Sequence, residues 1–265
     1  MYPIISPSAI PADAVLLDAR PPDAYAAGHL RGARNADVDR QLSSARDAGA
    51  DPRNGGRHPL PPIERFGAQL GAWGIAPSTT VVVYDDQAGA NAAARAWWML
   101  RAAGHENVVV LDGGYQAAVA AGMEVTTDVP EVAALPPYPV TEWQRGTVSR
   151  AEVDQLRLAE DWKVLDVRSA PRFRGETEPI DPIAGHIDGA VNLPYTENLS
   201  DGRFKSKEEL RGQYDQLLGD VKPDHLVVHC GSGVTACHTL LALEAAGIEG
   251  AKLYVGSWSE WCRNR

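Results

Sequence analysis

Residues 226–237 read LVVHCGSGVTAC, an apolar run that ends at a cysteine and is followed by small residues and a helical pattern. The apolar run is typical of a buried strand in a parallel sheet, and the pattern that begins at Ala236 is typical of the helix after such a strand. In parallel α/β sheets, ligands bind at the carboxyl ends of the strands. The stretch therefore predicts an α/β fold with Cys230 at its ligand-binding edge.

The chain contains two copies of one pattern, because four blocks of sequence recur in the same order. The first copy contains VLLDAR, YAAGHLRGARN, VVVYD and RAAGHENVVVLDGGY, and the second contains KVLDVR, IAGHIDGAVN, LVVHC and EAAGIEGAKLYVGSW. Each copy alternates short β-branched runs with helical segments, which predicts a parallel sheet flanked by helices. A proline-rich segment without apolar periodicity separates the copies. We therefore predict two tandem domains, residues 1–126 and 147–265, joined by a linker at 127–146.

Composition narrows the possible functions. The 265-residue chain is 44% hydrophobic and 23% charged, which is typical of a soluble globular protein. A net charge of −10 disfavours nucleic acids and anionic membranes as partners. No apolar stretch reaches the roughly 20 residues of a membrane span, and we expect no signal peptide. The three cysteines form no disulfide framework, so we expect a reducing, cytoplasmic environment.

The loop around Cys230 is suited to stabilising a negatively charged sulfur atom. Gly231 and Gly233 permit a tightly curled backbone whose N–H groups point inward. The helix that begins near Thr235 adds the positive end of its dipole. Such surroundings favour a thiolate over a thiol, and they would also hold a persulfide. Ser232 and Thr235 add hydroxyl donors to the same space.

Other interpretations of this loop compete with a thiolate nucleophile. A strand-end cysteine can be a packing residue, although glycines on both sides are an odd choice for packing alone. A cysteine phosphatase needs an arginine six positions after the cysteine, and that position is Ala236. A zinc site would need Cys237 and His238, which face different directions of the predicted helix. We therefore expect neither a metal nor a cofactor.

Three arginines follow the predicted strand KVLDV, within the sequence DVRSAPRFRGE at residues 166–176. They are Arg168, Arg172 and Arg174. Their place after a strand predicts that they reach the same edge of the sheet as Cys230. Arg168 has carboxylates close to it in the sequence, whereas the other two are better placed to bind an anionic substrate.

With these features the chain resembles the rhodanese family, and in particular its two-domain sulfurtransferases. The resemblance covers nearly the full length and rests on CGSGVTA, GHIDGAVN, DVRSAPRFRGE, SWSEW, ARAWWMLRAAGH and LDGG. The loop CGSGVTA is similar to that of the 3-mercaptopyruvate branch, whereas thiosulfate-preferring relatives carry basic residues after the cysteine. The resemblance implies two tandem rhodanese-like domains. Asp85 of VVVYD takes the place of Cys230 in the first copy, which implies that only the C-terminal domain is active.

The resemblance also implies a mechanism and its residues. The Cys230 thiolate would take sulfur from a small anionic donor, 3-mercaptopyruvate or alternatively thiosulfate. The resulting persulfide would pass the sulfur to cyanide, a thiol or thioredoxin. The residues implied to bind the persulfide and the donor are Gly231, Gly233, Val234, Thr235, Arg168, Arg172 and Arg174. Those implied in proton transfer are Ser232, Asp39 and His58.

One departure from the family pattern concerns the donor. The mercaptopyruvate branch normally reads EPR where this chain reads EPI at Glu178–Ile180, so a second carboxylate-binding arginine is missing unless Arg174 replaces it.

Two other classes of function stay open: a noncatalytic scaffold or regulatory module with the rhodanese fold, and a cysteine phosphatase or arsenate reductase. The place of Cys262 near the end of the sequence would allow exposure and redox activity.

Overall fold

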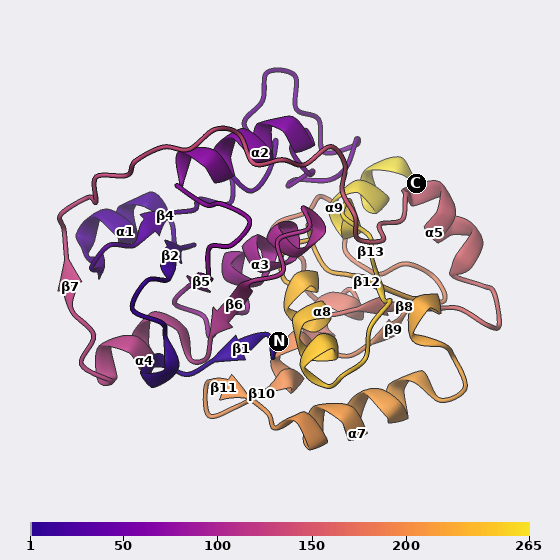
Figure 1. Cartoon of the computed structure of the whole chain (residues 1–265). Helices are drawn as coiled ribbons and strands as arrows, with labels where there is room; N and C mark the ends of the chain where they lie inside the picture. Colours follow the sequence, from indigo (N-terminus) through magenta and orange to yellow (C-terminus); the bar gives the residue numbers. More distant parts are fainter. Residues whose placement is uncertain (1) are drawn as a thin grey trace. The chain divides into compact units, whose positions relative to one another are not determined.

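A computed structural model describes residues 2–265 and divides them into two compact units, each with its own parallel sheet (Figure 1). The first unit contains the residues up to Ser44 together with Pro61–Arg145. The second contains Ala45–Leu60 and Gly146–Arg265. Among the described residues, no helix is long and apolar enough to cross a membrane.

The first unit has a parallel sheet in the order β1-β6-β5-β2-β4. Its strands are β1 (Ile4–Ile5), β2 (Val15–Asp18), β4 (Arg34–Asn35), β5 (Val81–Tyr84) and β6 (Val108–Leu111). A separate antiparallel pair is formed by β3 (His29–Leu30) and β7 (Val125–Thr126). The helices are α1 (Pro22–Ala27), α2 (Ile63–Ala72), α3 (Ala92–Ala102) and α4 (Gly114–Ala120), with a 3-10 turn η1 (Pro7–Ala9). Side chains of β5 are buried on both faces, as the continuous apolar run predicts.

The second unit has a parallel sheet in the order β13-β12-β8-β9. Its strands are β8 (Lys163–Asp166), β9 (Val191–Asn192), β12 (Leu226–His229) and β13 (Lys252–Leu253), and a small hairpin joins β10 (Leu199–Ser200) to β11 (Arg203–Phe204). The helices are α5 (Arg150–Leu156), α6 (Ala170–Phe173), α7 (Lys207–Leu218), α8 (Ala236–Ala245) and α9 (Ser257–Trp261). The 3-10 turns are η2 (Tyr195–Asn198), η3 (Pro223–His225) and η4 (Cys262–Asn264). Serine caps with matching glutamates begin α5 and α7.

The two units differ from the predicted domain boundaries in two segments. Most of the predicted linker belongs to the first unit, because the N–H groups of Leu135 and Tyr138 donate to carbonyl groups of α2, at Gly71 and Gly67. Residues 45–60 belong to the second unit, although they precede α2 in the sequence. This segment has no apolar periodicity, so only its contacts reveal its place.

Candidate active site

Cys230 lies directly after β12, at the carboxyl edge of the second sheet. The last residue of β12, His229, pairs with Asp166 at the end of β8. The loop after Cys230 is largely buried, and α8 begins at Ala236, as the sequence predicts. Cys230 itself is only 2% exposed. The strand and the helix therefore hold the thiol between a sheet edge and a helix N-terminus.

The first turn of α9 fixes the backbone of this loop. The N–H of Cys230 donates to Oγ of Ser257 at 3.1 Å, and the carbonyl groups of Cys230 and Gly231 accept from the N–H groups of Trp258 and Ser259 at 3.0 and 2.9 Å. In a trans peptide the N–H points opposite to the carbonyl group. The N–H groups of Gly231 and Ser232 therefore point away from α9.

Several N–H groups of the loop are available to a ligand. Within the part of the chain that the structure describes, the N–H groups of Gly231, Ser232, Val234 and Thr235 donate to no protein acceptor. Gly233 has φ +74°, and a Cβ there would lie 2.4 Å from the carbonyl oxygen of Val255, so the curled loop requires glycine. Buried N–H groups without acceptors favour a bound anion.

A histidine from the segment 45–60 contacts the same loop. Nδ1 of His58 lies 2.8 Å from Oγ of Ser232, although the two residues are 174 positions apart in the sequence. This contact brings together two of the residues that the family resemblance implies in proton transfer. Histidine and serine in hydrogen-bond contact can move a proton along one path.

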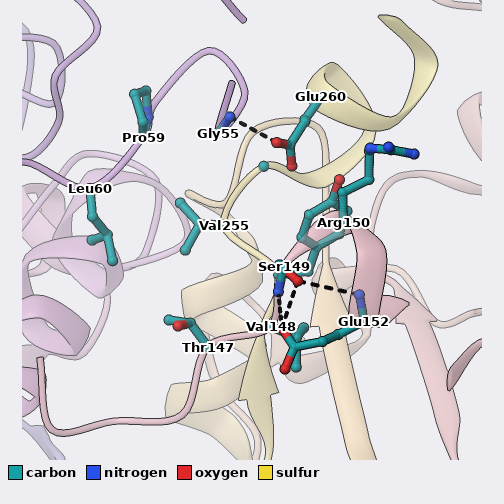
Figure 2. A pocket seen from close by; sticks show the side chains of 12 residues that line it. Gly55, Pro59, Leu60, Thr147, Val148, Ser149, Arg150, Glu152, Val255 and Glu260 are labelled. Atoms are coloured by element: carbon teal, nitrogen blue, oxygen red, sulfur yellow. Dashed lines mark hydrogen bonds between the residues drawn. The ribbon is translucent and has the colours of Figure 1, made fainter. Parts of the chain in front are cut away.

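The segment 45–60 is held against α9, as Figure 2 shows for Gly55 and Glu260. The N–H of Gly55 donates to Oε1 of Glu260 at 2.9 Å, and the N–H of Arg57 donates to Oγ of Ser259 at 3.0 Å. Between them, Gly56 has φ +79°, and a Cβ there would lie 2.3 Å from a carbonyl oxygen of Gly256. The pocket in Figure 2, of about 380 Å³, lies beside this contact. Cys230 and His58 are not among the residues that line it.

Two guanidinium groups flank the Cys230 loop at Gly231. A Cβ built on Gly231 would lie 3.3 Å from Nη2 of Arg57 and 3.5 Å from Nη2 of Arg172. Arg172 is also held by Glu178, with Nη2 2.7 Å from Oε1. The side chains of Arg57 and Arg172 keep 21% and 18% exposure, so solvent and ligands reach them.

The other two predicted arginines have different surroundings. Arg168 is buried, binds the carboxylate of Asp166 through Nε and Nη2, and donates from Nη2 to the carbonyl oxygen of Gly185 at 2.7 Å. The first unit has no cysteine, yet its Arg20 makes the same contacts with Asp18 and Gly28. The repeated geometry indicates that Arg168 braces the loop after its strand. Arg174 is exposed and pairs with Glu176 at 2.6 Å.

Asp39 lies in the first unit, in a turn that follows β4, and is partly buried. Val234 is buried and Thr235 is partly buried at the start of α8. Ser232 is 6% exposed. The structure thus brings His58, Ser232 and Arg172 to one loop, while Arg174 pairs elsewhere.

The remaining cysteines and the nearby histidines are packed in the interior. The expectation of an exposed Cys262 is wrong, because its side chain is 1% exposed; burial raises the pKa of this thiol. Sγ of Cys237 donates to the carbonyl oxygen of Gly233 at 3.3 Å, within the turn that starts α8. Burial lowers the pKa of His229, and it lowers the pKa of His238 to about 3. Among residues 2–265, no group of three histidine, cysteine or acidic side chains could hold a metal ion.

Sequence reasoning missed three residues of this site: Arg57, Ser257 and Asp181, whose buried carboxylate accepts from Nη1 of Arg57. Arg57 directly precedes His58, but its position in an aperiodic segment does not reveal which group it faces. Ser257 has φ +53°, an unusual conformation for a residue with a side chain, and it accepts the N–H of Cys230. The paired glycines at 55–56 are the signal that a close backbone approach occurs beside Arg57.

Known proteins resemble this chain over most of its length. The family of rhodanese-like domains matches residues 8–121 and 149–264, one range in each copy of the repeat. A "Probable 3-mercaptopyruvate sulfurtransferase" of Pseudomonas aeruginosa is 45% identical over 240 residues, which cover 89% of this chain and 82% of that protein. The "Thiosulfate sulfurtransferase" of Gallus gallus is 37% identical over 216 residues, covering 76% of this chain and 70% of that protein. The solved structure of a 3-mercaptopyruvate sulfurtransferase from Leishmania major matches with a TM-score of 0.83 and 33% identity, covering 98% of this chain and 74% of that one.

Proposed function

Because this chain belongs to the rhodanese family, we propose that it transfers the sulfur of 3-mercaptopyruvate to a thiophilic acceptor through a persulfide on Cys230. The family match on both repeats confirms the predicted fold class, two tandem rhodanese-like domains. The names of the relatives agree with the predicted class of enzyme, a sulfurtransferase. What we propose beyond the class of enzyme is the identity of the sulfur donor and the roles of the site residues. The observation that carries it is Cys230 in a loop whose N–H groups and flanking guanidinium groups all suit an anion.

In the first step, the Cys230 thiolate attacks the sulfur of the donor. A bond forms between the two sulfur atoms, and the carbon–sulfur bond of the donor breaks with its electron pair going to carbon. The products are the Cys230 persulfide and the enolate of pyruvate. The N–H groups of Gly231, Ser232, Val234 and Thr235 would stabilise the negative charge on the sulfur atoms.

The pyruvate enolate must take up a proton before it leaves as pyruvate. We assign this proton to the pair of His58 and Ser232, whose 2.8 Å contact supports a relay. Asp39, which the family resemblance implies as a third member, stays a proposal. When thiosulfate is the donor, the leaving group is sulfite, which needs no proton from the enzyme.

The donor carboxylate would bind to Arg57 and Arg172. A carboxylate accepts two parallel hydrogen bonds from a guanidinium group, which makes arginine well suited to this task. In the family pattern an arginine at the position of Ile180 binds the carboxylate. Arg57 would replace that arginine here, and Arg174 is not needed. Ile180 itself is 56% exposed. Arg168, through its bonds to Asp166 and Glu178, would brace this site.

In the second step, an acceptor attacks the outer sulfur of the persulfide. We propose cyanide, a small thiol or reduced thioredoxin as acceptors, each of which takes the sulfur and returns the Cys230 thiolate. The described cysteines form no disulfide, which suits the proposal of a reducing compartment such as the cytoplasm.

The test is a steady-state assay with 3-mercaptopyruvate and thiosulfate side by side and cyanide as the acceptor. We expect a kcat/KM at least about tenfold higher for 3-mercaptopyruvate, because only this donor uses both the arginine pair and the proton relay. A preference for thiosulfate would overturn the proposed donor but leave the persulfide chemistry. Turnover of neither donor, with the protein folded, would favour the noncatalytic scaffold. Hydrolysis of p-nitrophenyl phosphate that depends on Cys230 would favour the phosphatase.

A further inference from the structure

The buried carboxylate of Asp181 binds arginines from separate parts of the second unit. Its Oδ2 accepts from Nη1 of Arg57 and lies 3.9 Å from Nη2 of Arg172. Its Oδ1 accepts from Nη1 of Arg263 at 2.8 Å. The Asp181 side chain has no exposed surface. One oxygen therefore faces the arginines beside the Cys230 loop, and the other is bound by Arg263.

Arg263 is itself anchored to α9. It lies in η4, the turn that follows α9, and its Nη1 also donates to the carbonyl oxygen of Ser259 at 2.7 Å. Ser259 is the residue whose N–H binds Gly231 and whose Oγ binds the N–H of Arg57. The same short helix thus holds the Cys230 loop, the backbone of Arg57 and, through Arg263, the carboxylate that binds the Arg57 side chain.

The charges of this network leave an excess of positive charge at the Cys230 loop. Its ion pairs join four arginines to three carboxylates: Arg57, Arg168, Arg172 and Arg263 with Asp166, Glu178 and Asp181. One positive charge is therefore unmatched within the network. The guanidinium groups of Arg57 and Arg172, which meet at Gly231 and are partly exposed, are its members closest to this loop.

We propose that Asp181 is a positioning residue for the guanidinium of Arg57, and that Arg263 positions Asp181. Nη1 of Arg57 is bound to Asp181 while its Nη2 lies at Gly231, so the carboxylate determines which way the planar group faces. Arg263 prevents the carboxylate from turning away, because it occupies the other oxygen. The inference rests on the proposed function, since the orientation of Arg57 affects turnover only if Arg57 binds the donor. Donor affinity then depends on Arg263, whose side chain is bound to Asp181 and α9.

The first test compares two arginines that lie two positions apart. Arg263→Gln should raise KM for 3-mercaptopyruvate about three- to tenfold and leave kcat within about twofold, because binding is weakened and the sulfur chemistry is untouched. Arg265→Gln is the matched control: its guanidinium lies over the ring of Trp258 and binds the carbonyl oxygen of His186, but it is not among the arginines that pair with Asp181, so KM should stay as in the wild type. Equal KM values for Arg263→Gln and the wild type would overturn the proposal. So would a fall in kcat and melting temperature without a change in KM.

A double-mutant cycle separates positioning from a structural role. If Arg263 acts through Arg57, the KM effect of Arg263→Gln should disappear in a chain that already carries Arg57→Gln. Independent effects that multiply in the double variant would contradict the proposal. Asp181→Asn should resemble Arg57→Gln, but it leaves three partly buried arginines without their carboxylate and can lower stability. Arg263→Gln is therefore the decisive variant.

Alkylation of Cys230 distinguishes failure of this inference from failure of the proposed function. We expect wild-type Cys230 to favour negatively charged iodoacetate over neutral iodoacetamide, relative to a free thiol, and Arg57→Gln to lower this preference about tenfold or more. Arg263→Gln should lower it about three- to tenfold, with the iodoacetamide rate unchanged. If Arg57→Gln has no effect on the preference, Arg57 does not bind anions and the donor site proposed above is wrong. If Arg57→Gln lowers it and Arg263→Gln does not, only the positioning role is wrong. No reaction of the wild type with either reagent would contradict both.

Discussion

The loops after β5 and β12 occupy the same place in the two repeats but hold different groups. In the first unit, the carboxylate of Asp85 accepts from four backbone N–H groups, at 2.9, 2.8, 3.0 and 3.2 Å, donated by Gln87, Gly89, Asn91 and Ala93. In the second unit, Cys230 begins the loop, and the N–H groups of Gly231, Ser232, Val234 and Thr235 have no acceptor within residues 2–265.

The comparison supports the proposal that only the second repeat is active. Both loops curl their N–H groups after a buried strand and before a helix, which favours an anion. Asp85 supplies that anion from the chain itself, so its loop has no room for a charged substrate. Cys230 leaves the N–H groups of its loop for a sulfur anion or a persulfide. The loops also differ in sequence and length, but the clearest difference is that the carboxylate of Asp85 accepts from its own loop, whereas Cys230 offers no such acceptor to the N–H groups around it.

The largest effect should come from removing the thiol of Cys230. Cys230→Ser should lower sulfur transfer about 10⁴-fold or more, because a hydroxyl group does not attack the donor sulfur or form a persulfide. Mass spectrometry after addition of donor should show one added sulfur on the wild type and none on the variant. Cys237→Ser is the control, since its hydroxyl can keep the bond to Gly233. Persulfide on the Cys230→Ser chain would show that sulfur is carried elsewhere.

The proton relay should matter for one donor and not for the other. His58→Gln should lower kcat for 3-mercaptopyruvate about 10²-fold, because the enolate then lacks its proton source. With thiosulfate the loss should be about threefold or less, since sulfite leaves unprotonated. Ser232→Ala should show the same pattern. Equal losses with both donors would mean that His58 maintains the conformation of the loop and does not transfer a proton.

Acid should destabilise the Cys230 loop more than its counterpart. His238, the third residue of α8, is buried and has a pKa of about 3 in the folded protein, whereas α3 has Ala94 at that place. The unfolded chain binds this proton near pH 6.5, so the free energy of unfolding falls as pH drops from about 6.5 toward 3. We expect a loss of about 3 kcal/mol by about pH 4, measured by urea unfolding. His238→Gln should make this dependence less steep, while His229, whose pKa burial also lowers, keeps its own contribution. An equally steep profile in that variant would exclude His238 as a cause.

Replacing the carboxylate of Asp85 in the first loop should lower stability and leave sulfur transfer nearly unchanged. Asp85→Asn keeps the shape but places an amide nitrogen against backbone N–H groups, which should cost about 2 kcal/mol in the free energy of unfolding. Burial raises the pKa of Asp85, and the four N–H groups oppose that shift, so part of the cost is offset by removing a buried charge. The rate of persulfide formation on Cys230 should stay within about twofold of the wild type. An unchanged free energy of unfolding would show that the Asp85 carboxylate does not stabilise the first loop.

Much of the architecture was predictable because it depends on local pattern. The runs at Val81–Tyr84 and Leu226–His229 are strands, and each is followed by a helix, Ala92–Ala102 and Ala236–Ala245. The repeat of these blocks predicted two α/β domains, and the glycines around Cys230 predicted a curled loop. The three arginines after β8 were only partly predictable. The carboxylates near Arg168 in the sequence indicated its ion pair with Asp166, whereas nothing in the sequence separated Arg172, which lies at Gly231, from Arg174, which pairs with Glu176.

The sequence by itself determined the α/β class, the duplication and the placement of Cys230 at the carboxyl end of a strand. These follow from hydrophobic periodicity and backbone preference, which act over a few residues. Only the tertiary structure decided that residues 45–60 join the second unit, where Arg57 and His58 reach the Cys230 loop. It also decided that Asp181 links Arg57 to Arg263. Such contacts join residues that are far apart in the chain, and they depend on shape and charge complementarity that no local pattern encodes.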